Sequence, residues 1–157
     1  MEALQQTKKG VCIRPQTIDN ATATSYVIDT VGVDYVNIDV VIGDTDVAMA
    51  TLKVQESDVY SSATALGGTP NDVTGAVYGT STNPDTGSTS ALPSATDDGK
   101  IFSFSINTQA RKRYLQLVAV AGNGTTGTAL SASWEANKVS QTDLSATGRG
   151  VAACLKA

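Results

Sequence analysis

Two stretches of alternating apolar and polar residues constrain the fold of this chain more than any other feature. Their apolar positions are Val36, Ile38, Val40 and Ile42 in residues 34–43, and Ala48, Ala50, Leu52 and Val54 in residues 47–56. A period of two residues is typical of a half-buried β-strand. The connector contains Gly43, Asp44 and Asp46, residue types that accept turn conformations, so the pattern predicts a β-hairpin of two long strands.

A further strand is predicted at residues 26–31, where Gly32 ends it, and two more at 101–107 and 128–138, where alternation recurs. Residues 114–121 are nearly all apolar, which predicts a central strand covered on both sides. The predicted core consists of Val36, Ile38, Val40, Leu52, Val54, Phe104, Leu117, Val118 and Trp134. No segment shows a sustained helical period. We therefore expect an all-β fold, either a β-sandwich or a jelly-roll-like barrel of antiparallel hairpins.

The length of 157 residues fits one domain that can bury a substantial core. Residues 1–21 show no sustained period and are predicted to be an extended N-terminal arm. Residues 22–138 are predicted to form the β-sandwich, with a Ser/Thr/Gly-rich surface excursion at 61–99 that includes a short strand near 73–78. Residues 139–157 are predicted to be a C-terminal tail.

Charge is distributed unevenly along the chain. Between residues 15 and 99 there is one basic residue, Lys53, against twelve acidic ones, whereas the flanking segments hold ten basic residues against three acidic ones. This either reflects ordinary scatter or predicts separate acidic and basic surfaces that suit contact with another copy or a charged partner. The candidate partner-binding residues are Lys8, Lys9, Arg14, Arg111, Lys112 and Arg113. The cluster at residues 111–113 has the alternative interpretation of a solvated turn. With so few basic residues and a net charge of −4, no nucleic-acid partner is expected.

The residue types needed for common catalytic sites are missing or badly placed. The sequence has no histidine, so Ser-His-Asp, Cys-His and histidine-dependent metal sites are excluded. The pairs Asp44 with Asp46 and Asp97 with Asp98 are better explained as turn residues than as calcium ligands. We expect no catalytic, metal or cofactor site, and no enzyme activity.

Two cysteines, Cys12 and Cys154, lie near opposite ends of the chain. They would meet only if the terminal segments run side by side, and the favoured interpretation is that both are buried and inert. The sequence contains neither a long apolar stretch nor an apolar segment near its start, so we expect no membrane association and no secretion. The expected place of synthesis is the host cytoplasm.

Several of these segments carry a resemblance to a known class of protein. They are residues 26–30, 34–38, 52–58, 100–104 and 111–115. In their order and pattern they resemble a type of small tailed-phage virion protein found among head structural genes, some relatives of which are capsid decoration, or cement, proteins. The resemblance covers roughly residues 24 to 135 and consists mostly of strand patterns.

The resemblance implies a structural protein located on the capsid surface of the virion. Such a protein sits as an oligomer, often a homotrimer, outside the head and binds the major capsid protein. The implied function is stabilisation of the capsid through many small contacts multiplied by symmetry. The alternative is a carbohydrate-binding tail or adhesin module. That alternative is weakened because Phe102, Phe104 and Trp134 fall on predicted core faces, and only Tyr60 and Tyr78 lie in predicted loops.

Overall fold

The protein is a β-sandwich in the computed structural model, which describes residues 8–137 and 153–156. Its strands are β1 (Lys8–Ile18), β2 (Ile28–Asp29), β3 (Tyr35–Thr45), β4 (Thr51–Ser57), β5 (Tyr60–Ser62), β6 (Ala65–Leu66), β7 (Asn71–Val77), β8 (Ile101–Asn107), β9 (Tyr114–Val120), β10 (Thr128–Asn137) and β11 (Ala153–Lys156). The described residues contain no helix. The prediction of an all-β sandwich is therefore confirmed.

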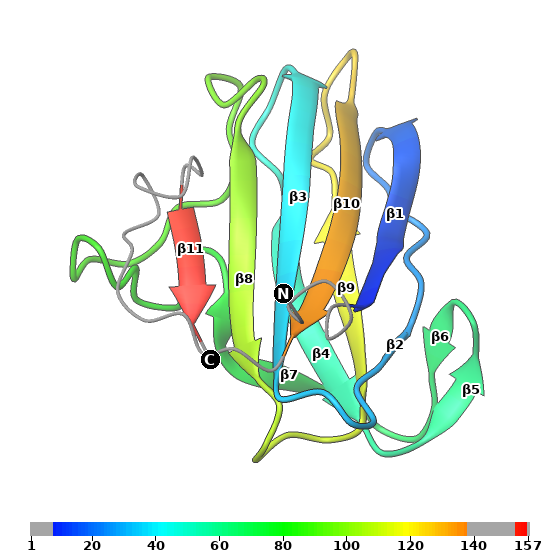
Figure 1. The fold of residues 1–157 in the computed structure, drawn as a ribbon. Helices are drawn as coiled ribbons and strands as arrows, with labels where there is room; N and C mark the ends of the chain where they lie inside the picture. Colours follow the sequence, from blue (N-terminus) through cyan, green and yellow to red (C-terminus); the bar gives the residue numbers. More distant parts are fainter. Residues whose placement is uncertain (1–7, 138–152, 157) are drawn as a thin grey trace.

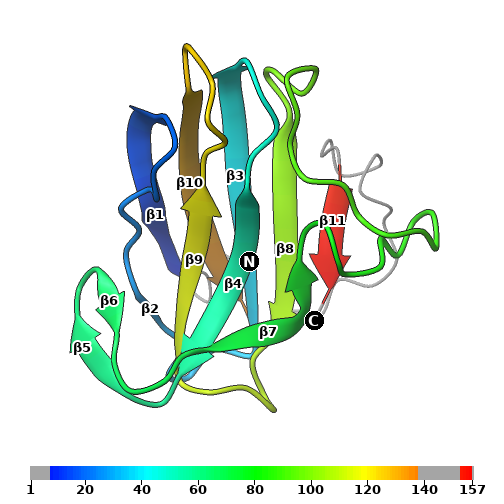
Figure 2. The same ribbon diagram turned by 180° about the vertical axis from the view of Figure 1, so that it is seen from behind.

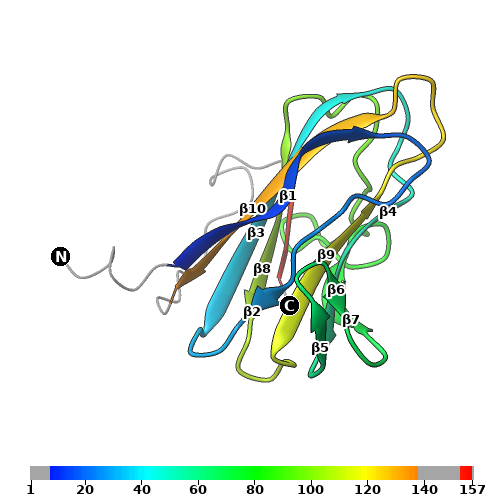
Figure 3. The same ribbon diagram turned by 90° about the vertical axis from the view of Figure 1, so that its right-hand side faces the viewer.

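Two sheets form the layers of the sandwich. The five-stranded sheet has the order β1-β10-β3-β8-β11 and is seen in front in Figure 1. The four-stranded sheet has the order β2-β9-β4-β7 and faces the viewer in Figure 2. Neighbouring strands in both sheets are antiparallel except β11, which runs parallel to β8. Viewed from the side, the two layers lie against one another and the β5–β6 hairpin stands at one corner (Figure 3).

The two alternating stretches do not form the predicted hairpin. Strand β3 pairs with β10 and β8 in one sheet, whereas β4 pairs with β9 and β7 in the other. The connector at residues 46–50 thus crosses between layers, and the apolar faces of β3 and β4 meet across the core. Strands β8 and β9 are also divided between the sheets. A period of two identifies the buried face of a strand, but the partner can lie beside that strand or opposite it.

Most of the predicted core is confirmed. Its buried members are Val36, Ile38, Val40, Leu52, Val54, Phe104 and Leu117. They come from β3, β4, β8 and β9, so the core lies between the two sheets. Burial alternates along β9, and Val118 is half-exposed opposite Lys53 on the outer face of the four-stranded sheet. The prediction that residues 114–121 are covered on both sides was therefore wrong, as was the inclusion of Val118 in the core.

Trp134 is less buried than predicted. It packs against the buried core but is itself only partly buried. It lies near the end of β10, opposite Gly10 in the edge strand β1. The neighbour across this pair has no side chain, so the indole ring extends over Gly10 of β1.

Most of the segment expected to be an arm is strand β1. Cys12 and Ile13 in this strand are fully buried, and residues 8–18 pair along β10. The pairing register shifts between Val11 and Ile13 and again between Ile13 and Gln16. Each shift changes which side chains face the core, so the strand has no continuous period in the sequence. Residues 1–7 lie outside the described part of the chain.

The Ser/Thr/Gly-rich excursion contains both strands and an anchored loop. The short strand expected near residues 73–78 is confirmed as β7. Residues 78–100 then run over the surface and are held by backbone hydrogen bonds, including Met49 N–H to the Pro93 carbonyl at 2.9 Å and Gly99 N–H to the Ile42 carbonyl at 2.9 Å. The predicted tail contributes β11, which is an edge strand of the five-stranded sheet, while residues 138–152 and 157 lie outside the described part.

The cysteines lie in strands at opposite edges of the five-stranded sheet. Cys12 belongs to β1 and Cys154 to β11, with three strands between them. At about 4.8 Å per strand the two backbones are roughly 19 Å apart, far beyond the roughly 7 Å that a disulfide spans. They do not pair within one chain. Cys12 is buried and free, and burial raises the pKa of its thiol to about 12.

Candidate functional site

The predicted binding residues must be placed relative to the two ends of the sandwich, which the strand register defines. Ile18 pairs with Thr128, and Thr128 with Thr45, at one end. We call this the loop end, and it consists of residues 18–22, 45–50, 93–100 and 121–127. The start of β1 lies at the opposite end, which also includes the β8–β9 connection at residues 108–113. We call this second end the turn end, and both are visible in Figure 1.

Carboxylates of the loop end accept hydrogen bonds from backbone amides. Asp46 accepts from the N–H groups of Thr125 and Thr126 at 2.5 and 2.8 Å. These bonds lower the pKa of Asp46. Asp19 accepts from Gly124 N–H at 2.8 Å. Asp98 accepts from the N–H of Thr45 at 3.0 Å. The aspartates therefore stabilise loop conformations, as expected of turn carboxylates.

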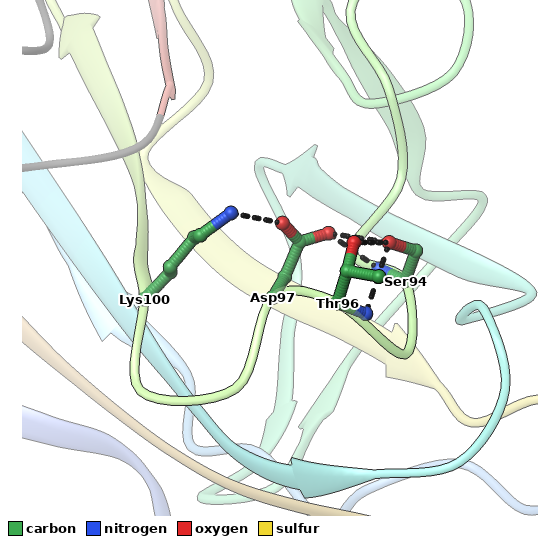
Figure 4. A network of polar contacts seen from close by, with 4 residues as sticks. All are labelled: Ser94, Thr96, Asp97 and Lys100. Carbon is green, nitrogen blue, oxygen red and sulfur yellow. Dashed lines mark hydrogen bonds and ion pairs between the residues drawn. The ribbon is translucent and has the colours of Figure 1, made fainter.

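A second network braces the loop that precedes β8 (Figure 4). The Oδ2 atom of Asp97 accepts from both the backbone N–H and the hydroxyl of Ser94 at 2.8 Å. Its Oδ1 atom accepts from Lys100 Nζ at 2.8 Å. Burial raises the pKa of Asp97, but the bonds from Lys100 and Ser94 outweigh burial and the pKa is lowered. Among the described residues, no three His, Cys, Asp or Glu side chains form a group that could hold a metal ion.

The predicted N-terminal cations all lie on β1. Lys9 forms an ion pair with Glu135 of β10 at 3.1 Å. Lys8 Nζ lies 5.7 Å from the centre of the Trp134 ring, and Arg14 Cζ lies 5.1 Å from the centre of the Tyr26 ring. Within the described residues neither Lys8 nor Arg14 has a carboxylate ion-pair partner. Lys8 and Arg14 are therefore supported by aromatic rings and remain available for an external anionic group, whereas Lys9 is paired with Glu135.

The cluster at residues 111–113 is largely engaged within the molecule. Arg111 Nη1 lies 4.0 Å from Glu56 Oε1, and Arg111 Nη2 donates to the Thr74 carbonyl at 3.2 Å. The backbone N–H of Lys112 donates to Glu56 Oε2 at 3.2 Å. Arg113 donates twice to Asp29, from Nε at 3.0 Å and from Nη2 at 2.8 Å. This cluster therefore connects the β8–β9 turn to neighbouring strands.

The acidic and basic surfaces expected from the sequence lie elsewhere than predicted, because the arginines of the 111–113 cluster are paired. The loop end is acidic, because it holds Asp19, Asp46, Asp97 and Asp98 against Lys100. The two arginines of the turn end are matched by Glu56 and Asp29. What remains of the expected basic surface is the edge strand β1. A partner role for all six candidate residues stays a prediction.

Two tyrosines expected in loops have different environments. Tyr78 is buried, and its ring packs edge-on against Phe102 and Phe104 at 5.3 and 5.1 Å. Tyr60 is exposed and lies beside Tyr114, with ring centres 5.6 Å apart. No sequence pattern indicates this pairing, because Tyr114 begins a strand 54 positions later and the β5–β6 hairpin has to fold back to reach it.

Comparisons with protein families, with curated proteins and with solved structures found no match to this chain. Within the described residues there is no helix with the length and apolar character needed to span a membrane. The site must therefore be interpreted from its own residues.

Proposed function

We propose that this chain is a virion structural protein of the capsid decoration type, which binds the outside of a phage head and stabilises it. The observation that carries the proposal is the exposed, cationic edge of β1. The resemblance of the strand segments to small tailed-phage virion proteins supports the same assignment. The major capsid protein is the proposed partner, together with further copies of the chain in a homotrimer.

The free edge of β1 has the features of a protein contact surface. Segment 24–26 covers this edge from Cys12 to Gln16, through Tyr26 N–H to the Cys12 carbonyl at 2.7 Å, a bridge between Ile13 and Ser25, and a bond from the Gln16 side chain to the Thr24 carbonyl at 3.5 Å. Lys8 to Val11 lie beyond that cover, and Val11 is 53% exposed. On binding, Val11 would lose its water and form a small apolar centre, and the nearby cations would surround it with charge, as in protein interfaces.

Side-chain contact fits this edge better than addition of another strand. Lys8, Lys9, Pro15 and the two register shifts are features that prevent indiscriminate strand pairing. The proposed partner therefore presents acidic side chains to Lys8 and Arg14. The acidic loop end of a second copy has the required charge, so the same chemistry supports self-association on the head.

The experiment that tests this function is re-addition to heads. Heads purified without the protein are expected to release DNA at a lower temperature than complete heads. Purified protein added back should restore the release temperature, because a ligand that binds only the assembled state stabilises it by mass action. Electron microscopy of the complete particles should show the chain in icosahedral copy number.

Two results would count against the proposal. Heads with and without the protein could release DNA at the same temperature, which removes the stabilising role. Microscopy could also locate the chain in the tail or neck, which removes the capsid partner.

A further inference from the structure

The β5–β6 hairpin brings two tyrosines together on the outside of the four-stranded sheet. Tyr60 is 53% exposed, and its ring plane is inclined by 45° to that of Tyr114. Arg113 Cζ lies 4.9 Å from the centre of the Tyr114 ring, and Arg113 also binds Asp29. We call Asp29, Tyr60, Arg113 and Tyr114 the tyrosine cluster. It combines the exposed ring of Tyr60 and the half-buried ring of Tyr114 with a polar pair at their border.

The hairpin that carries Tyr60 is held in place by several hydrogen bonds. The Gln116 side chain of β9 donates to the Thr64 carbonyl at 2.8 Å and accepts from Leu66 N–H at 3.3 Å. Val27 N–H donates to the Ala63 carbonyl at 2.9 Å. The hairpin is thereby fastened to β9 and to the segment before β2. Tyr60 is consequently positioned before any ligand arrives, which reduces the entropy cost of binding.

The polar pair retains unused hydrogen-bonding capacity. Arg113 uses two of its five N–H groups on Asp29, which leaves three donors. Asp29 Oδ1 accepts from both Arg113 and Val31 N–H, while Oδ2 accepts from Arg113 alone. The side chains of Arg113 and Asp29 are 49% and 41% exposed. The cluster can therefore both donate to and accept from a neutral polyhydroxyl ligand.

We propose that the tyrosine cluster is a carbohydrate-binding site, in which a pyranose ring stacks on the exposed ring of Tyr60 beside Tyr114 and its hydroxyls bind Arg113 and Asp29. The negative face of an aromatic ring attracts the polarised C–H groups of a sugar. The opposite charges of Arg113 and Asp29 cancel, so the site favours a neutral sugar over an anion. The site is independent of the proposed contact at β1.

The test is saturation-transfer NMR on the full chain with three separate probes: methyl α-D-glucopyranoside, methyl β-D-galactopyranoside and N-acetyl-D-glucosamine. At least one probe is expected to receive saturation at its ring protons. Tyr60→Ala should weaken that binding by about tenfold, which corresponds to about 1.4 kcal/mol. Tyr60→Phe keeps the ring and should retain binding. Tyr26→Ala is the matched control, because Tyr26 also lies beside an arginine, Arg14, at 5.1 Å.

The remaining outcomes overturn the proposal. Failure of all three probes to receive saturation, or equal binding by the wild type and Tyr60→Ala, removes the sugar site. Sedimentation of the same samples tests the other use of such a surface. If the wild type sediments as an oligomer and Tyr60→Ala as a monomer, the tyrosine cluster is a contact between copies of the chain. None of these results depends on whether the protein binds heads.

Discussion

Gly10 and Trp134 face each other across the β1–β10 pair so closely that residue 10 has no room for a side chain. A Cβ atom at residue 10 would lie 2.5 Å from the indole Nε1 and 2.7 Å from Cε2. The indole also lies under Lys8 and packs against the core. The glycine thus allows a large ring to close this edge of the sandwich.

Gly10→Ala should lower the free energy of unfolding by about 1–3 kcal/mol, the usual cost of overpacking. Urea unfolding measures the change. The control is the same substitution in a Trp134→Ala background, where the clash is absent and the cost should largely disappear. An equal loss in both backgrounds would mean that backbone conformation, and not the ring, requires glycine there.

Within the 111–113 cluster, charge reversal at Arg111 should lower stability more than charge reversal at Lys112. The side chains of Arg111 and Glu56 are only 19% and 12% exposed. Arg111→Glu would place two carboxylates together there, and we expect a loss of about 1–3 kcal/mol. Lys112→Glu is the matched control and should change stability by less than about 0.5 kcal/mol. Thermal unfolding compares them, and equal effects would contradict a structural role for Arg111.

The predictable part of the fold is the part that a period of two describes. Alternation identified the buried faces of β3, β4 and β8, because every second residue of a strand shares a side. It failed for β1, whose two register shifts interrupt the period. It also failed to assign partners, so strands β3 and β4 were expected to pair although they lie in different sheets.

The candidate site was less predictable, because it depends on contacts between distant segments. Arg113 and Asp29 are 84 residues apart in sequence, and the sequence could not show that they pair. The run of three cations was therefore interpreted as a solvated turn or as a contact with an acidic surface, and not as a set of intramolecular pairs. Lys8 and Arg14 were identified from charge alone, while the aromatic rings beside them became evident only in the folded protein.

Acid should destabilise the protein through aspartates whose pKa is lowered by the fold. Asp72 is one example, since hydrogen bonds from Lys53 and Gln55 lower its pKa below the ordinary 3.8. A lowered folded pKa contributes stability above pH 3.8, and this contribution is lost as the pH falls through the folded value. Asp72→Asn should therefore lose less stability than the wild type below pH 3.8. Urea unfolding at several pH values tests this, with exposed Asp44→Asn as the control; a wild-type acid response in Asp72→Asn would contradict it.

Alkali should act through Cys12, whose thiol pKa is raised from 9.0 to about 12 chiefly by burial and secondarily by Asp39. Above pH 9.0 the unfolded thiol ionises while the folded one stays protonated. Stability is therefore fully present below that pH and is lost as the pH rises toward 12, by up to about 4 kcal/mol. Cys12→Ala should be less stable at neutral pH but decline less steeply over this range. Parallel curves for the two proteins would show that other groups cause the alkaline loss.

Reversing a β1 cation should weaken binding to heads in a salt-dependent way. Arg14 lies on β1 beside Tyr26 of the covering segment and has no ion-pair partner among the described residues. If an acidic surface of the head faces it, Arg14→Glu replaces attraction by repulsion, and the loss of affinity should shrink as salt rises because the screening length falls to about 10 Å at 0.1 M. Lys112→Glu changes the net charge equally but lies in the β8–β9 turn, so it should bind nearly as the wild type does. Sedimentation of heads with labelled protein measures both affinities. Equal weakening by the two variants would indicate that net charge, and not the β1 edge, governs binding.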